Sequence, residues 1–93
     1  MYAIVLIRYR RPLEEVQAHQ EAHRDYIRDL HARDVVIAGG PLDPRNGGAF
    51  LVRLPDGQGL ELVYRIRDED PYIKAGVVQY ETLIWNPIIG GID

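Results

Sequence analysis

Residues 2–9, Tyr-Ala-Ile-Val-Leu-Ile-Arg-Tyr, decide the fold. Side chains alternate between the two faces of a β-strand, and in this stretch both alternating sets are apolar. One set consists of Ala3, Val5 and Ile7, and the other of Tyr2, Ile4 and Leu6. A strand that is apolar on both sides is covered on both faces of its sheet. We therefore expect a sheet that has helices on one face and a second layer of protein on the other.

A helix is predicted to follow this strand. Pro12 suits the first helical position, and the helix is expected to run unbroken to about Arg33. Spacings of three and four define its core-facing stripe, which comprises Leu13, Val16, Gln20, His23, Ile27 and Leu30. The opposite side belongs in water and carries Gln17, Glu21, Arg24 and His31.

Three more strands are predicted, at residues 35–38, 49–54 and 77–85. Gly39, Gly40 and Pro41 are expected to end the first of them, and Asn46-Gly47 is a strong hairpin signal before the next. The final strand is apolar on both sides and leads into an apolar tail at residues 88–92.

The segment 58–69 is ambiguous. Its leucines, Tyr64 and Ile66 alternate with charged residues, which favours a strand, whereas the apolar stripe of the helical alternative is weaker. Asp70-Pro71 directly afterwards is a helix start, with Asp70 as the cap, and Gly76 stands where a short helix would end.

Composition excludes several classes of protein. The chain has 93 residues, enough for one domain spanning 1–93, and it contains no cysteine and no serine, which excludes disulfides, thiolate metal sites and serine or cysteine nucleophiles. The net charge of −3 and the scattered basic residues argue against nucleic-acid binding. The apolar stretch 2–7 is too short for a signal peptide or a membrane span, so we expect no membrane association and a cytoplasmic location.

The order of elements predicts an α+β fold of the ferredoxin-like βαββαβ type with a four-stranded antiparallel sheet, if 58–69 is helical. Two helices cover only one face of such a sheet. An uncovered apolar face would exceed the ~300–600 Å² patch that a monomer tolerates. The expected solution is a homodimer that packs sheet against sheet.

Three short motifs and this order of elements make the chain resemble the YCII-related family. The motifs are the run around His23, the turn at residues 38–42, and the sequence Asp-Pro-Tyr-Ile-Lys-Ala-Gly-Val at 70–77. The resemblance implies a ferredoxin-like domain that pairs into a dimeric α+β barrel, and it implies a helix at 58–69. The chain departs from the family pattern at Asp34, where the family usually has glycine, so we expect the connection before the second strand to differ in shape.

His23 and Asp70 are the candidate catalytic residues. A partly buried imidazole can act as a general acid and base near neutral pH, although His23 could equally be a buried structural histidine with one hydrogen-bond partner. Asp70 could be only a helix cap, worth about 1 kcal/mol, or a carboxylate that orients the imidazole. The resemblance implies that His23 is the catalytic histidine and that the two residues share one cleft.

Candidate ligand-binding residues are Gly39, Gly40, Pro41, Tyr72 and Gly76. Glycines let a backbone approach a ligand closely, although all of them could simply make turns. Tyr72 could stack on a flat ligand or fill the core. His19 and His23 are four residues apart, but no third ligand is obviously placed, so we expect no metal and no cofactor.

Two functions fit these residues. The first is a cofactor-independent lyase or isomerase, for example one catalysing a dehydrochlorinase-like elimination, that uses the His-Asp pair on a small cyclic or aromatic oxygenated metabolite. The second is a dimeric module without catalysis that binds a small molecule or assists a larger enzyme. Activities known for related barrels favour the first only by analogy of fold.

Overall fold

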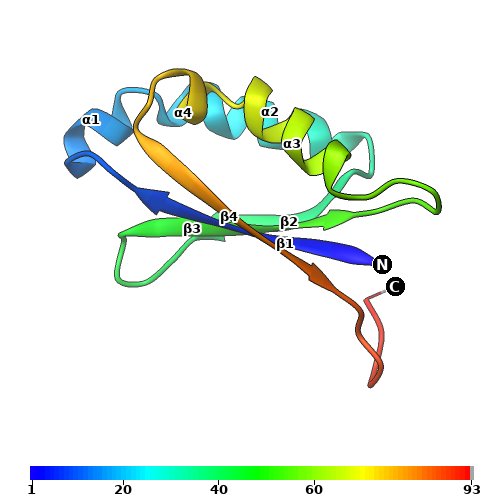
Figure 1. Ribbon diagram of the computed structural model, residues 1–93. Helices are drawn as coiled ribbons and strands as arrows, with labels where there is room; N and C mark the ends of the chain where they lie inside the picture. The colour runs from blue at the N-terminus through cyan, green and yellow to red at the C-terminus, as the bar shows by residue number, and fades with distance from the viewer. Residues whose placement is uncertain (93) are drawn as a thin grey trace.

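A computed structural model of the protein describes residues 1–92 and places one antiparallel sheet beneath a layer of helices (Figure 1). The 4-stranded sheet has the order β2-β3-β1-β4. The elements are β1 (Tyr2–Tyr9), α1 (Leu13–Gln17), α2 (Gln20–Ala32), β2 (Val36–Pro41), β3 (Gly47–Arg53), α3 (Leu60–Glu69), α4 (Pro71–Lys74) and β4 (Val78–Trp85). The ferredoxin-like α+β prediction is confirmed.

Strand β1 lies between β3 and β4 and alternates as predicted. Its helix-facing residues Ala3, Val5 and Ile7 are at most 3% exposed. Across the sheet, Val5 is opposite Phe50 of β3 and Thr82 of β4. The core forms between this face and the helices, because Val16, Leu30 and Val63 belong to the same buried cluster.

The long first helix is interrupted, contrary to the prediction of one helix from Pro12 to Arg33. The amide of His19 donates to the carbonyl of Val16, three residues back, at 3.0 Å, so the chain tightens between α1 and α2. Leu13, expected on the core-facing stripe, is exposed instead.

The prediction that Gly39, Gly40 and Pro41 end the second strand is wrong, because all three belong to β2. They pair with Phe50, Ala49 and Gly48 of β3. Strand β2 is an edge strand, where proline is tolerated because its missing N–H leaves no ladder bond unmade. Strand β3 begins at Gly47, so the glycine of the hairpin signal lies in the strand rather than in the turn.

The segment 58–69 contains helix α3, as the family resemblance implies, so the strand favoured by its alternation does not form. Val63 and Ile66 are its buried residues, and they fall on one helical face. Asp70 ends α3 and also caps α4, as predicted, by accepting a hydrogen bond from the Tyr72 amide. Gly76 follows α4 with φ +70, the left-handed conformation expected of a helix terminator.

Asp34, between α2 and β2, has φ 63 and is the one non-glycine residue with positive φ among those described. Aspartate tolerates this region better than most residues, although glycine adopts it without strain. Asp34 therefore supplies a left-handed turn at the position where the sequence suggested a differently shaped connection.

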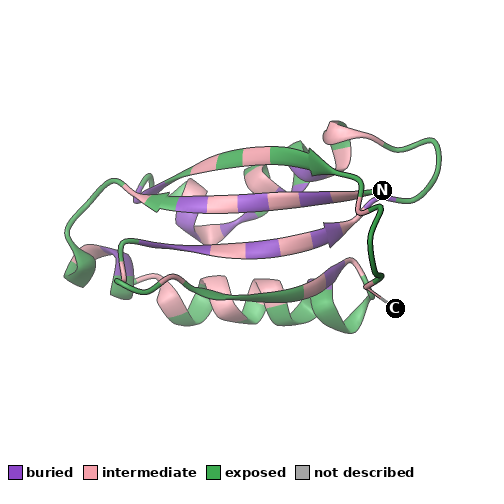
Figure 2. Ribbon diagram, turned by 90° about the horizontal axis from the view of Figure 1, so that it is seen from below, coloured by how far each residue is buried: buried purple, intermediate pink, exposed green. Residues whose placement is uncertain are grey.

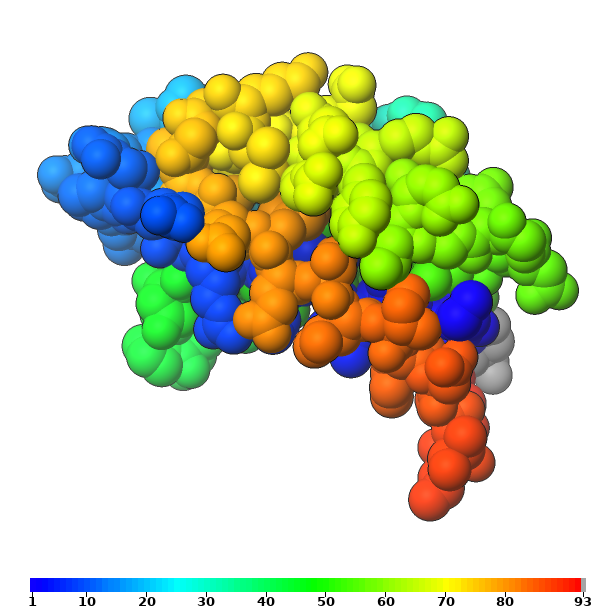
Figure 3. All heavy atoms as spheres, viewed as in Figure 1, coloured from blue at the N-terminus to red at the C-terminus, as the bar shows by residue number. Residues whose placement is uncertain are grey.

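The sheet face opposite the helices carries no second layer from residues 1–92 (Figure 2). Tyr2, Ile4 and Leu6 alternate onto this face between Leu51 of β3 and Leu83 of β4. The tail after β4 projects away from the body of the molecule (Figure 3), and Ile88 and Ile89 are about nine-tenths exposed. Among the residues described, no helix has the length and apolar character needed to cross a membrane.

Candidate functional site

His23 and Asp70 meet between the helices and the sheet. His23 comes from the first turns of α2, and Asp70 from the junction of α3 and α4. The imidazole Nδ1 lies 2.8 Å from Oδ1 of Asp70. The side chain of His23 is 12% exposed and that of Asp70 is 0% exposed, so this contact is shielded from solvent on the aspartate side.

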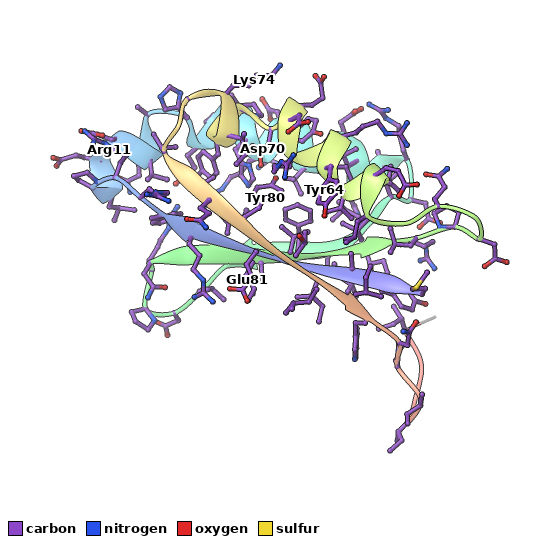
Figure 4. The ribbon with its side chains drawn as sticks, in the orientation of Figure 1. Arg11, Tyr64, Asp70, Lys74, Tyr80 and Glu81 are labelled. Atoms are coloured by element: carbon purple, nitrogen blue, oxygen red, sulfur yellow. The ribbon has the colours of Figure 1, made fainter. Side chains whose placement is uncertain are left out.

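The buried carboxylate of Asp70 accepts from three groups. Its Oδ1 receives the Tyr72 amide at 2.9 Å in addition to the imidazole, and its Oδ2 receives the hydroxyl of Tyr80 from β4. Asp70 and Tyr80 point toward each other beneath the helices in Figure 4. A carboxylate only accepts hydrogen bonds, so Nδ1 of His23 is the ring nitrogen that carries the donated proton.

The ring of Tyr72 stacks on the imidazole of His23. The two ring centroids are 4.0 Å apart and the planes differ by 10°. Since Nδ1 is bound to Asp70, the remaining ring nitrogen is Nε2, which has no hydrogen-bond partner within residues 1–92. Nε2 is thus the atom of His23 that is free to exchange a proton with a ligand.

His23 lines a cavity of about 300 Å³ between α2 and the sheet. Gly39, Gly40, Pro41 and Tyr72, four of the five candidate ligand-binding residues, also line this cavity. Asp70 lies behind His23 and does not line it, and Gly76 lies outside it, exposed on the turn after α4. The apolar part of the wall comes from Ile7, Tyr9, Ile27, Ala49 and Phe50.

Residues 1–86 match the family model of the YCII-related domain. The chain belongs to the YCII-related domain family. Among solved structures, it is similar to 5-chloro-2-hydroxyhydroquinone dehydrochlorinase from Burkholderia phenoliruptrix, determined in complex with 2,5-dihydroxybenzoquinone. The TM-score is 0.66 at 22% sequence identity, and the alignment covers 90% of this chain and 93% of that one. No curated protein matches the sequence.

Two tyrosines of this YCII-related domain are held protonated by burial. Burial, and then the charge of Asp70, raise the pKa of Tyr80 far above its ordinary value of 10. The same two causes raise the pKa of Tyr26 to about 12, and its hydroxyl donates to the Ile66 carbonyl at 2.8 Å. Tyr80 therefore remains a hydrogen-bond donor to Asp70 throughout the physiological pH range.

The cavity of the YCII-related domain is also lined by Arg24, Arg28 and Arg45, none of which the sequence indicated. Arg24 was expected in water, but it is half-buried against the cavity. Arg45 comes from the loop between β2 and β3, where no pattern predicts which way a side chain points. Only its position directly after His23 marks Arg24 as a residue near the site.

No three histidine, aspartate or glutamate side chains gather closely enough to hold a metal ion anywhere in residues 1–92. His19 precedes α2 and makes no capping hydrogen bond through its side chain. His31 is exposed, as expected, and its Nδ1 lies 2.8 Å from the carbonyl oxygen of Val36. His23 is thus the one histidine of the described chain that joins a carboxylate to the cavity.

Proposed function

We propose that this protein is a cofactor-independent acid/base enzyme that acts on a small cyclic or aromatic oxygenated compound. The observation that carries the proposal is the 2.8 Å contact between His23 Nδ1 and Asp70, which leaves Nε2 unpaired on a side chain that lines a cavity. A cavity of about 300 Å³ is at the lower end of the range for small-molecule sites and suits a single ring.

In this proposal, Nε2 of His23 removes a proton from a saturated carbon of the ring or from a hydroxyl group conjugated with the ring. The electron pair of the broken bond forms a new double bond. In an elimination, a leaving group such as chloride departs with its own electron pair from a saturated carbon at the other end of the conjugated system, so a hydroxylated aromatic ring first takes up a proton at that carbon. In an isomerisation, the imidazolium returns the proton to a different carbon. Asp70 orients the imidazole and stabilises the imidazolium while it exists.

The similar dehydrochlorinase supplies a first compound to test, because its name gives a chlorinated hydroxyquinol as the substrate. Chloride release from 5-chloro-2-hydroxyhydroquinone measures elimination. Exchange of ring C–H for deuterium in D₂O, followed by NMR, measures proton transfer even when no leaving group is present. We expect His23→Gln to lower either rate by roughly 10²–10⁴-fold, the usual contribution of a general base.

His19→Gln is the matched control, because His19 lies four residues earlier and its side chain makes no capping bond. It should retain the rate of the unsubstituted protein. Equal rates in His23→Gln and the unsubstituted protein would contradict the role of His23. Tight binding of a ring compound with neither exchange nor turnover would favour the alternative, a module that binds a small molecule without catalysis.

We also propose that the protein works as a homodimer in which two sheets face each other. The uncovered face of the sheet is apolar at Tyr2, Ile4, Leu6, Leu51 and Leu83. The molecule measures 38 × 25 × 20 Å, so its broad face is comparable with the ~800 Å² that each partner buries in a standard interface. A second copy is self-complementary to such a face.

A further inference from the structure

The wall of the cavity beside His23 is basic, although the protein as a whole has a net charge of −3. Arg24, Arg28 and Arg45 line it, and no aspartate or glutamate does. A cleft lined by charge of one sign attracts ligands of the opposite sign, since its low-dielectric walls focus the field.

The three arginines differ in how far they are already neutralised. Arg28 is mostly exposed and pairs with Asp25 at 2.9 Å. Arg24 and Arg45 have no carboxylate partner among residues 1–92. Arg45 donates from one terminal nitrogen to the side-chain oxygen of Gln20, yet its Nε is buried and has no hydrogen-bond partner.

A buried guanidinium N–H without a partner carries a free-energy cost that a ligand acceptor can remove. Charges of Arg24 and Arg45 also act on the hydroxyl of Tyr72. Burial raises the pKa of that hydroxyl, and both arginines oppose the rise, Arg45 more than Arg24. Arg24 and Arg45 line the same cavity as Tyr72, the tyrosine that stacks on His23.

We propose that Arg24 and Arg45 bind a carboxylate carried by the ring substrate, so that the compound enters the cavity as an anion. This proposal rests on the proposed function for the identity of the site, but not on turnover. Guanidinium groups match carboxylates in shape and donate two parallel hydrogen bonds to them, which makes arginine the usual residue for this anion. The apolar wall at Ile7, Ile27 and Phe50 would contact the ring itself.

The test compares two ring compounds that differ only in charge, 2,5-dihydroxybenzoate and 2,5-dihydroxybenzamide, by isothermal titration calorimetry on the full chain. We expect the acid to bind at least about tenfold more tightly than the amide. Arg24→Gln and Arg45→Gln should each weaken binding of the acid by about tenfold and leave binding of the amide unchanged. Arg33→Gln is the matched control, because Arg33 follows α2, is exposed and pairs with Asp29.

Equal affinity for acid and amide, or no binding of the acid at millimolar concentration, would overturn the anion site. So would an equal loss in Arg33→Gln, since the effect would then come from overall charge. Thermal unfolding of each variant separates lost binding from lost folding. Selective binding of the acid without deuterium exchange would support the anion site and overturn the catalytic proposal. Turnover that depends on His23 but shows no preference for the acid would support the catalytic proposal and overturn the anion site.

Discussion

The ring of Tyr72 lies parallel to the imidazole of His23, with centroids 4.0 Å apart, and the backbone amide of the same tyrosine donates to the carboxylate that holds this imidazole. The short motif Asp70-Pro71-Tyr72 thus contacts His23 at its edge and on its face. A ring held in both ways keeps one orientation without a ligand, which is what an acid/base group needs in order to act at a fixed atom.

Asp70→Asn is expected to fold, with reduced stability, and to lose activity. The amide oxygen can still accept from the Tyr72 amide, but the amide nitrogen is a donor and meets the Tyr80 hydroxyl, which also donates. Rearranging these buried bonds should cost about 1–3 kcal/mol in the free energy of unfolding. The rate should fall tenfold or more, because no carboxylate stabilises the imidazolium.

Urea unfolding and the deuterium-exchange assay measure these two effects separately. Asp68→Asn is a suitable control, because Asp68 lies two residues before Asp70 and is an exposed carboxylate that pairs with the neighbouring Arg67. If Asp70→Asn exchanges deuterium at the rate of the unsubstituted protein, the carboxylate has no part in the mechanism.

Stability should decline at alkaline pH through Tyr80, Tyr26 and Tyr72. All three have pKa values raised by burial, that of Tyr26 to about 12, whereas tyrosines in an unfolded chain titrate near 10. Above pH ~10 the folded chain therefore binds more protons than the unfolded chain, so the free energy of unfolding falls as the pH rises. Below pH ~10 this contribution is fully present.

Tyr80→Phe should make that alkaline decline shallower, since one of the three tyrosines with a raised pKa is gone. At neutral pH the same variant should be less stable by roughly 1–3 kcal/mol, because Oδ2 of Asp70 loses its donor. Urea midpoints at pH 8, 9, 10 and 11 measure both effects. Tyr64→Phe removes an exposed hydroxyl and serves as the control (Figure 4); slopes above pH 10 that are equal in the two variants would contradict the prediction.

The two glycines of β2 that line the cavity should respond differently to alanine. A Cβ on Gly39 would lie 2.9 Å from Cβ of Phe50, whereas one on Gly40 would meet no atom within 4 Å. Gly39→Ala should therefore cost roughly 1–3 kcal/mol, the usual range for overpacking, and Gly40→Ala should leave the unfolding midpoint nearly unchanged. Urea unfolding of both variants checks this, and equal midpoints would show that β2 shifts to accept either methyl group.

Local sequence rules predicted the parts of the fold that depend on local interactions. The alternation in β1, the cap at Asp70 and the left-handed Gly76 need only neighbouring residues, and the structure has all three. The strand alternation at 58–69 was misleading, because Val63 and Ile66 bury one helical face against the sheet, a contact with residues distant in sequence. Gly39 to Pro41 were misjudged for the same reason, since pairing with β3 outweighs their weak strand propensity.

The candidate site likewise contains some residues that the sequence predicts and others that it does not. The motif resemblance implies that His23 and Asp70 share one cleft; the structure places them 2.8 Å apart, but His23 lines the cavity and Asp70 lies behind it. Tyr80, Arg24 and Arg45 were missed, because their contacts depend on where β4, α2 and a loop lie in space. Tyr80 belongs to a strand that the sequence predicts to be apolar on both sides, and this pattern does not tell whether a hydroxyl finds a buried carboxylate.

The final prediction concerns the uncovered sheet face. Leu83 lies on it opposite Ile4, and its side of β4 also carries Trp85, whose ring centroid is 6.4 Å from that of Tyr2. Leu83→Glu would place a charge in the centre of the proposed interface without touching the helix-facing core. Burying an unpaired carboxylate against apolar side chains costs several kcal/mol, so we expect this variant to be monomeric.

Light scattering coupled to size exclusion at micromolar concentration gives the mass directly, and the unsubstituted protein should have twice the chain mass of 10.6 kDa. Leu13→Glu makes the same chemical change at a leucine that is exposed to a similar degree, 39% against 45% for Leu83, but lies on α1. It should remain dimeric, because α1 is on the opposite side of the sheet (Figure 1). A monomeric unsubstituted protein would refute the dimer, and dissociation of both variants would place the interface elsewhere.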